Sequence, residues 1–158
     1  MGTRHERPTM PGYGIQAASE GVGLLPWSFV GNRMLAARNY WIGSTRPDGA
    51  PHAAPVWGLW HEDAFYFSSG AQSVKARNLA ADARAVVHLE SGDEVVILEG
   101  VMDLETDEQL LKVLNVLYQS KYGFDMVGPG VIYRLNTKRA LAWREEDFPT
   151  SATRWNFD

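Results

Sequence analysis

The segment from Ser73 to Arg77 contains the residue types that bind a phosphate group. Ser73 is a good N-cap for the helix-forming residues after it, and the free backbone N–H groups at a helix N-terminus attract anions. Lys75 and Arg77 add positive charge beside that N-terminus. Because these two residues lie two positions apart, they cannot share one helical face. We therefore expect one to hold a phosphate and the other to reach a neighbouring part of the ligand or a partner subunit, unless Ser73 simply caps a solvated helix.

The remaining reactive side chains offer little independent chemistry. The chain has no cysteine, which excludes disulfides, thiolate catalysis and iron–sulfur clusters. Its histidines have no metal-ligand spacing, so we expect no metal site. These histidines are His5, His52, His61 and His88. No Ser-His-Asp or paired-carboxylate arrangement can be assigned, so the catalytic side chains stay unknown and any reaction must depend on a bound cofactor.

Composition and charge place the chain among ordinary folded proteins. It has 158 residues, of which 45% are hydrophobic and 22% charged, and this suits one domain with its own core. The net charge of -4 is spread along the chain without a block of Lys or Arg, so we expect neither nucleic acid nor a membrane as partner. The polar, Pro- and Gly-rich N-terminal stretch has no apolar run, which leads us to expect a cytoplasmic protein.

Most of the chain reads as short strands that hold the Ser73 segment in place. Residues 1–26 have no helix or strand period and are expected to form an extended arm. Helical spacing predicts a short helix over 29–39. A meander of three strands follows, with the turn Arg46-Pro47-Asp48-Gly49 between the first two. The expected strands are 40–45, 52–60 and 64–68.

The second half of the chain repeats the pattern of strands and helices. A helix over 72–82 carries the Ser73 segment, and the turn Ser91-Gly92-Asp93 joins two strands, 84–90 and 94–104. Thr106 and Gln109 form a capping box for the clearest helix, which continues to Lys121. Two further strands are expected at 131–136 and 140–144. These elements predict a mainly β fold with helices, a barrel domain over 27–147 and a C-terminal tail over 148–158.

Five short motifs in this order carry a family resemblance. They are Trp41-Ile42-Gly43-Ser44-Thr45, Asp48-Gly49-Ala50-Pro51-His52, Pro55-Val56-Trp57, Tyr66-Phe67-Ser68 and Ser73-Val74-Lys75-Ala76-Arg77-Asn78-Leu79. Together they resemble the pyridoxamine 5'-phosphate oxidase-like split-barrel superfamily, and the Lys-x-Arg-Asn-Leu stretch is similar to its flavin/deazaflavin oxidoreductases that bind coenzyme F-420. The resemblance implies a six-stranded antiparallel split β-barrel of the FMN-binding type. It also implies a homodimer with two cofactor sites at the subunit interface.

The resemblance also implies which residues hold the cofactor. The strand around Gly43 would lie along the cofactor ring, where small residues allow close approach, although a bend in the barrel explains this glycine as well. A core role for Trp57, a structural role for His52 and ordinary turn hydroxyls at Ser68 and Ser69 stay open. The implied cofactor-binding residues are Trp41, Gly43, Ser44, Thr45, His52, Pro55, Val56, Trp57, Phe67, Ser68, Ser69, Ser73, Lys75, Ala76, Arg77 and Asn78.

The function implied by this resemblance is an oxidoreductase that passes hydride from reduced coenzyme F-420 to a small unsaturated substrate. The alternatives are an FMN-binding pyridoxamine 5'-phosphate oxidase-related protein, a non-catalytic flavin- or deazaflavin-binding protein, and a haem-handling barrel that uses His52 or His88. The C-terminal residues 153–158 depart from the tail of the vitamin B6 oxidases, which argues against that substrate.

Aromatic residues near both ends of the chain would be costly to leave in water. We expect both ends to pack against the barrel or a partner subunit near the cofactor. There Tyr13, Trp155 or Phe157 would form a wall of the pocket.

Overall fold

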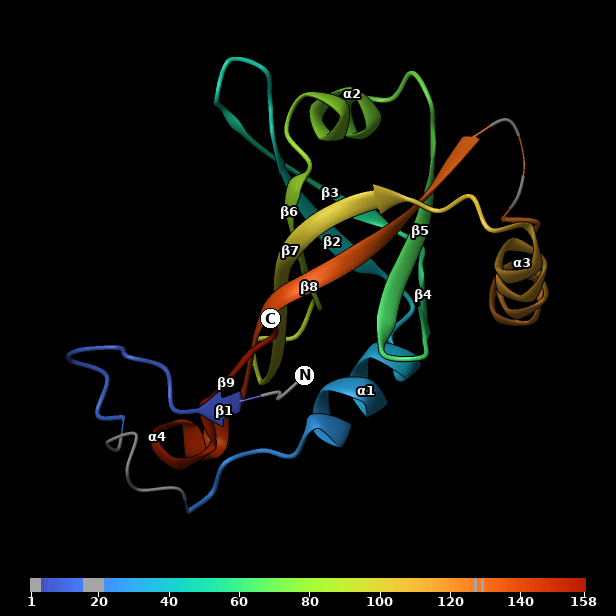
Figure 1. The fold of residues 1–158 in the computed structure, drawn as a ribbon. Coiled ribbons are helices and arrows are strands. Elements are labelled where there is room, and N and C mark those ends of the chain that lie inside the picture. Colours follow the sequence, from blue (N-terminus) through green and yellow to red (C-terminus); the bar gives the residue numbers. More distant parts are fainter. Residues whose placement is uncertain (1–3, 16–21, 127, 129) are drawn as a thin grey trace.

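The computed structural model describes residues 4–15, 22–126, 128 and 130–158. Within these residues, nine strands form one antiparallel sheet in the order β1-β9-β8-β7-β6-β2-β3, and β5 pairs with both β4 and β8 (Figure 1). The strands are β1 (Arg4–Glu6), β2 (Tyr40–Thr45), β3 (Pro51–Val56), β4 (Leu59–His61), β5 (Ala64–Gly70), β6 (Arg84–His88), β7 (Glu94–Leu104), β8 (Gly130–Arg144) and β9 (Thr153–Asn156). The helices are α1 (Trp27–Ala36), α2 (Val74–Ala81), α3 (Glu108–Tyr122), the short 3-10 helix η1 (Glu145–Asp147) and α4 (Phe148–Ser151).

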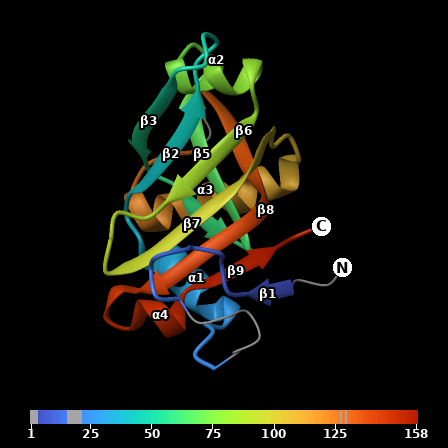
Figure 2. The same cartoon turned by 90° about the vertical axis from the view of Figure 1, so that its left-hand side faces the viewer.

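The long strand β8 connects the two parts of the sheet. One edge of β8 pairs with β7 along most of its length, while the other edge pairs first with β5 and then with β9 (Figure 2). The sequence predicted two strands here, and the structure has one, because the polar residues between them face outward rather than forming a turn. The ladder is irregular at Gly100, where a Cβ would lie 2.2 Å from the carbonyl oxygen of Asn136. Only glycine allows the two strands to approach so closely there.

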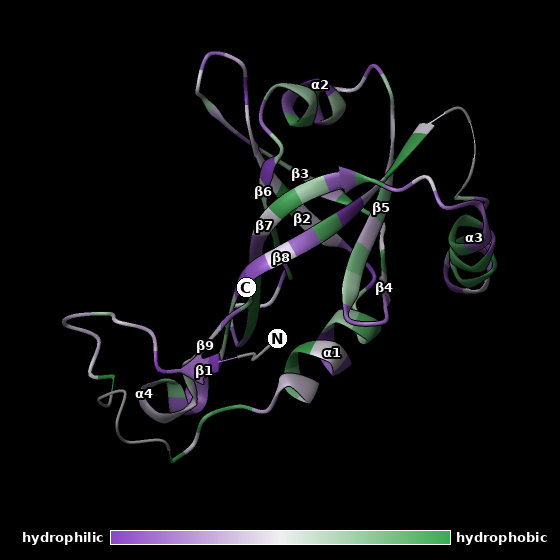
Figure 3. Ribbon diagram, viewed as in Figure 1, coloured by the Kyte–Doolittle hydropathy of each residue, from purple (hydrophilic) through white to green (hydrophobic). Residues whose placement is uncertain are grey.

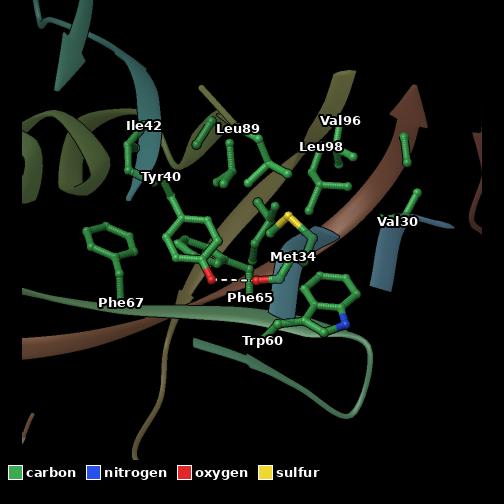
Figure 4. Close-up of a cluster of buried hydrophobic side chains, with 14 of the residues drawn as sticks. Val30, Met34, Tyr40, Ile42, Trp60, Phe65, Phe67, Leu89, Val96 and Leu98 are labelled. Carbon is green, nitrogen blue, oxygen red and sulfur yellow. Dashed lines mark hydrogen bonds between the residues drawn. The ribbon is translucent and has the colours of Figure 1, made fainter. Parts of the chain in front are cut away.

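The main core lies inside the barrel, where side chains alternate between the two faces of each strand. In β2, Tyr40, Ile42 and Ser44 are buried while the residues between them face outward. Met34 and Val30 of α1 are fully buried and seal one end of the barrel (Figure 4). The Tyr40 hydroxyl donates to the Met34 carbonyl oxygen at 2.6 Å, so the phenol enters the core with its polar atom satisfied.

A second, smaller cluster fixes α3 to β4 and β5, outside the main core. Leu114, Tyr118 and Tyr122 of the helix pack there against Leu59 and Tyr66. Figure 3 shows green and purple residues mixed along α3, as expected for a helix with one packed face.

The starts of two helices differ from the sequence-based prediction. Asp107, not Thr106, caps α3, and its carboxylate accepts from the Leu110 N–H at 2.9 Å. The acidic side chain one position later satisfies the same orphan N–H groups and also suits the helix dipole. The first helix begins at Trp27, earlier than predicted, with Pro26 as its N-cap residue.

Both ends of the chain contribute a strand, within the segments that were interpreted as an extended arm and a tail. Strand β9 pairs with β8, and β1 pairs with β9, which raises the strand count above the predicted six. The Trp155 side chain is 2% exposed and meets Trp27 edge-on at 5.4 Å between ring centroids. It therefore belongs to the core and not to the wall of an open pocket. Tyr13, by contrast, is 69% exposed.

No helix in the described part of the chain is long and apolar enough to cross a membrane.

Candidate functional site

A cleft of about 1010 Å³ is lined by residues of β3, β2, β6, β7, β8 and β9. Figure 2 shows how these strands lie side by side. The cleft is lined by small side chains and charged ones. Its residues are Gly43, Ser44, Thr45, Pro51, His52, Ala53, Arg84, Ala85, Val86, Glu99, Gly100, Val101, Lys138, Arg139 and Asn156. The strand register places Gly43 directly between Ala53 of β3 and Val86 of β6. The centre of the lining therefore consists of small apolar residues that project little from the sheet.

Gly43 is not required by the backbone. Its φ is not positive, and a Cβ would meet the Val86 Cβ at an ordinary 3.6 Å. A larger residue would therefore fit the sheet, yet glycine in a strand interior lowers stability by roughly 0.5–1 kcal/mol relative to alanine. The close approach of a ligand to the strand would account for a glycine here.

The charged side chains of the cleft are mainly cationic, although the whole chain carries -4. Arg84, Lys138 and Arg139 line the cleft together with one carboxylate, Glu99. Arg139 pairs with Glu99 at 2.6 Å between nitrogen and oxygen. Lys138 is exposed and has no ion pair within the described residues. A cation without a counter-ion in an acidic protein favours an anionic ligand.

Arg84 is partly neutralised by a carboxylate outside the cleft. It pairs with Asp82 at 2.6 Å, and its hydrogen bonds lower the pKa of Asp82 to about 2. This pair joins the end of α2 to the start of β6, so it fixes the guanidinium at the rim of the cleft.

One end of the cleft is polar and adjoins α2. The Asn78 side chain of α2 is buried and donates from Nδ2 to the Ser44 hydroxyl at 3.2 Å. The Nδ1 atom of His52, across the β2–β3 ladder from Ser44, is buried and has no hydrogen-bond partner. A buried polar atom without a partner is costly, so a ligand group that bonds it would be stabilised here.

The predicted phosphate segment forms the N-terminus of α2. Ser73 caps the helix and accepts from the Ala76 N–H at 3.0 Å, while its hydroxyl lies 2.7 Å from that of Ser69. Lys75 is half-buried and Arg77 is exposed. These residues do not line the cleft themselves. The bond between Asn78 and Ser44 is the link between this helix and the cleft.

The structure separates the other predicted site residues. Gly43, Ser44, Thr45 and His52 line the cleft. Trp41 and Pro55 are cross-strand neighbours next to it on the outward face. The remaining side chains lie elsewhere. Phe67 and Ala76 are buried in the core, Val56 packs against the core, Ser68 is half-buried on β5, and Trp57 stacks on Tyr122 at 4.6 Å in the second cluster.

Eleven of the fifteen cleft residues were not among the predicted site residues. Lys138 and Arg139 lie in the stretch that was interpreted as a break between two strands, and Gly100 and Glu99 lie in a strand that was assigned no site. The signal that could have found them is the adjacent pair of cations at 138–139 between two apolar runs.

A family model described as pyridoxamine 5'-phosphate oxidase matches residues 34–144. The chain belongs to the pyridoxamine 5'-phosphate oxidase family. The matched region contains every residue of the cleft except Asn156. The family region thus runs from the end of α1 to the end of β8, and the two terminal strands lie outside it.

Solved structures of several other proteins share the fold of this chain. The conserved hypothetical protein Rv2991 from Mycobacterium tuberculosis is 22% identical, with a TM-score of 0.70 over 79% of this chain and 88% of that one. A heme binding protein from Mycobacterium smegmatis is 17% identical (TM-score 0.61, 75% of this chain, 54% of that one). An F420 reductase is 18% identical (TM-score 0.55, 69% of this chain, 94% of that one). No curated protein matches the sequence significantly. At these identities the pyridoxamine 5'-phosphate oxidase family member described here shares only a fold with these proteins. We infer its cofactor from the residues of its own cleft.

Proposed function

We propose that the chain binds a planar anionic cofactor of the flavin type in this cleft, coenzyme F-420 or FMN, and uses it to transfer hydride to a small unsaturated substrate. The observation that carries the proposal is the low apolar lining around Gly43 beside a cationic rim. An aromatic ring system needs the first feature, and a phosphate needs the second.

The cleft is large enough for such a molecule. It extends from β3 to β9, which is five strand spacings and therefore ~24 Å. Gly43, Ala53 and Val86 would hold the ring, and Lys138 is the cation most available for an anionic group because it has no ion pair among the described residues. The polar end by Asn78 and the capped N-terminus of α2 offer a second place for a phosphate.

The cofactor would supply the hydride, and the residues of this chain would supply binding and orientation. The apolar lining would exclude water from one ring face.

The test is a fluorescence titration of purified protein with F-420 and with FMN, followed by assays of hydride transfer. Lys138→Glu places a negative charge at the rim and is expected to weaken binding at least ten-fold. Lys112→Glu makes the same change at an exposed position on α3, away from the cleft, and is the matched control. Micromolar binding without hydride transfer would indicate a protein that binds the cofactor without catalysing a reaction. Binding of neither cofactor, or equal effects of the two variants, would refute the site.

We also propose that a second copy of the chain covers the outward face beside the cleft. A row of apolar and aromatic side chains crosses four neighbouring strands there, formed by Trp41, His88, Ile97 and Leu141. A homodimer would bury this row and close the cleft. The expected sedimentation mass is twice 17.6 kDa. Leu141→Glu should give monomers, while Val116→Glu on the exposed face of α3 should not.

A specific observation on His88 supports haem as a second candidate ligand. Its Nδ1 lies 2.8 Å from the Leu89 carbonyl oxygen, which holds the proton on Nδ1 and leaves Nε2 as an iron ligand. The histidine lies beside Trp41 on the outward face, with ring planes 3° apart. Haemin titration should show a Soret shift that His88→Ala abolishes and His61→Ala retains. If both variants keep the Soret shift, His88 is not the haem ligand.

A further inference from the structure

Lys121, in the last turn of α3, lies far from the cleft and joins three elements through its amine. Its Nζ donates to the Tyr40 hydroxyl at 2.7 Å and to the Gly58 carbonyl oxygen at 3.1 Å. Tyr40 begins β2, and Gly58 lies between β3 and β4. The side chain is half-buried, so solvent still reaches part of it.

The surroundings of the amine contain aromatic rings and a second cation but no counter-ion. Nζ lies 4.8 Å from the centroid of the Tyr40 ring and 5.1 Å from that of Tyr122. The Arg38 guanidinium lies over the same Tyr122 ring at 5.6 Å. Among the described residues, Lys121 has no ion pair with a carboxylate. The titratable groups that face it are therefore Tyr40, Tyr122 and Arg38.

This environment makes the amine less basic than that of an exposed lysine. Burial, and then the charge of Arg38, lower the pKa of Lys121 to about 8. A neutral amine has two N–H groups and one lone pair. The Tyr40 hydroxyl and the Gly58 carbonyl accept both N–H groups, so the lone pair stays free. A held amine with a free lone pair is a nucleophile.

We propose that Lys121 is an acylation site that reacts with small acyl phosphates. The amine nitrogen attacks the acyl carbon and forms the C–N bond, while the bond from that carbon to the phosphate oxygen breaks. Phosphate leaves with the electron pair, and the proton lost from nitrogen goes to water. The exposed guanidinium of Arg38 is placed to bind the departing anion.

Acylation changes how α3 is held. The amide keeps one N–H and no charge, so it cannot donate to both Tyr40 and Gly58. The Gly58 carbonyl oxygen also accepts from the Tyr122 hydroxyl at 2.9 Å, and the Gly58 N–H donates to that hydroxyl at 3.0 Å. This contact remains after acylation. We therefore expect the last turn of α3 to loosen without leaving the barrel, with faster amide exchange after modification.

The experiment is limited acetylation of the full chain by acetyl phosphate, with peptide mass spectrometry at its four lysines, Lys75, Lys112, Lys121 and Lys138. At pH 8 about half of the Lys121 amine is neutral, against roughly 0.4% for an ordinary exposed lysine. A less basic amine is also a weaker nucleophile, which reduces the advantage of the larger neutral fraction by about ten-fold. We expect about ten-fold more acetyl on Lys121 than on Lys112, which is exposed on the same helix. Equal or smaller labelling of Lys121 between pH 7 and 9 overturns the proposal.

A second arm tests the role of the phosphate. Arg38→Gln should lower the rate ratio of acetyl phosphate to the uncharged donor N-acetylimidazole at Lys121, and Arg46→Gln, at another exposed arginine, should not. The ratio cancels any change in the ionisation of the amine. An unchanged ratio in Arg38→Gln, or faster reaction with an acetyl thioester than with acetyl phosphate, overturns the assignment of acyl phosphates.

Discussion

Replacing Gly43 by valine separates a ligand-binding role of this glycine from a structural one. The position accepts a Cβ at ordinary contact distance, 3.6 Å from the Val86 Cβ and 3.8 Å from its carbonyl oxygen. A β-branched residue in a strand interior stabilises by about 0.5–1 kcal/mol over glycine. We therefore expect the melting temperature of the ligand-free protein to rise by about 1–4 °C.

The same valine should weaken cofactor binding. A tricyclic ring lying on the strand makes on the order of 30 heavy-atom contacts of about 0.15 kcal/mol each. Lifting the ring by about 1 Å loses a quarter to a half of this attraction, or about 1–2 kcal/mol. The expected increase in Kd is about 5- to 30-fold in the fluorescence titration.

The control is Gly31→Ala in α1, whose Cβ would meet Trp60 Nε1 at 3.6 Å. It should stabilise the protein by about 1 kcal/mol and leave the Kd unchanged. Unchanged affinity in Gly43→Val would show that no ring lies on this strand. Unfolding of that variant would show that the barrel itself requires the glycine.

Three other perturbations have defined outcomes. Lys75→Ala should weaken cofactor binding by about 1–3 kcal/mol if α2 holds a phosphate, and an unchanged Kd would remove this lysine from the site. Trp155→Ala should cost about 3–5 kcal/mol in urea unfolding, because its ring is buried against Trp27, and a loss below 1 kcal/mol would contradict that packing. The pair with Arg84, which lowers the pKa of Asp82, stabilises the fold at pH values above 3.8, the ordinary pKa of the group. This stabilisation is lost as the pH falls toward 2, so Asp82→Asn should make the free energy of unfolding depend less on pH between these values. An unaltered profile would show that the pair with Arg84 contributes nothing.

Strands β2, β5, β6 and β7 could be predicted from the sequence because local signals agree with the fold there, whereas the predicted strand 52–60 is divided between β3 and β4. The turn at 46–49 does connect β2 and β3, and Ser73 does cap α2. The family was also accessible from short motifs, since these fall in the region 34–144 that the family model matches.

The cleft could not be predicted in full because its residues come from strands far apart in sequence. Gly43 and Arg139 lie on the same face only through the intervening β6 and β7, and no local pattern encodes that order. The strand β9 was missed although Thr153, Trp155 and the residues between them alternate inward and outward. Four residues are too short a run for that period to be recognised without the neighbouring strand.

The pairing of β1 with β9 has a kinetic consequence. The ion pair that accompanies it, Arg154 with Glu6, joins residues 148 positions apart. Closing so long a loop is slow, so this ladder should form last during folding. It should also open first in the native state, since β1 has only three residues. Each opening frees the edge of β9, and a free strand edge is where copies of a β-sheet protein begin to aggregate.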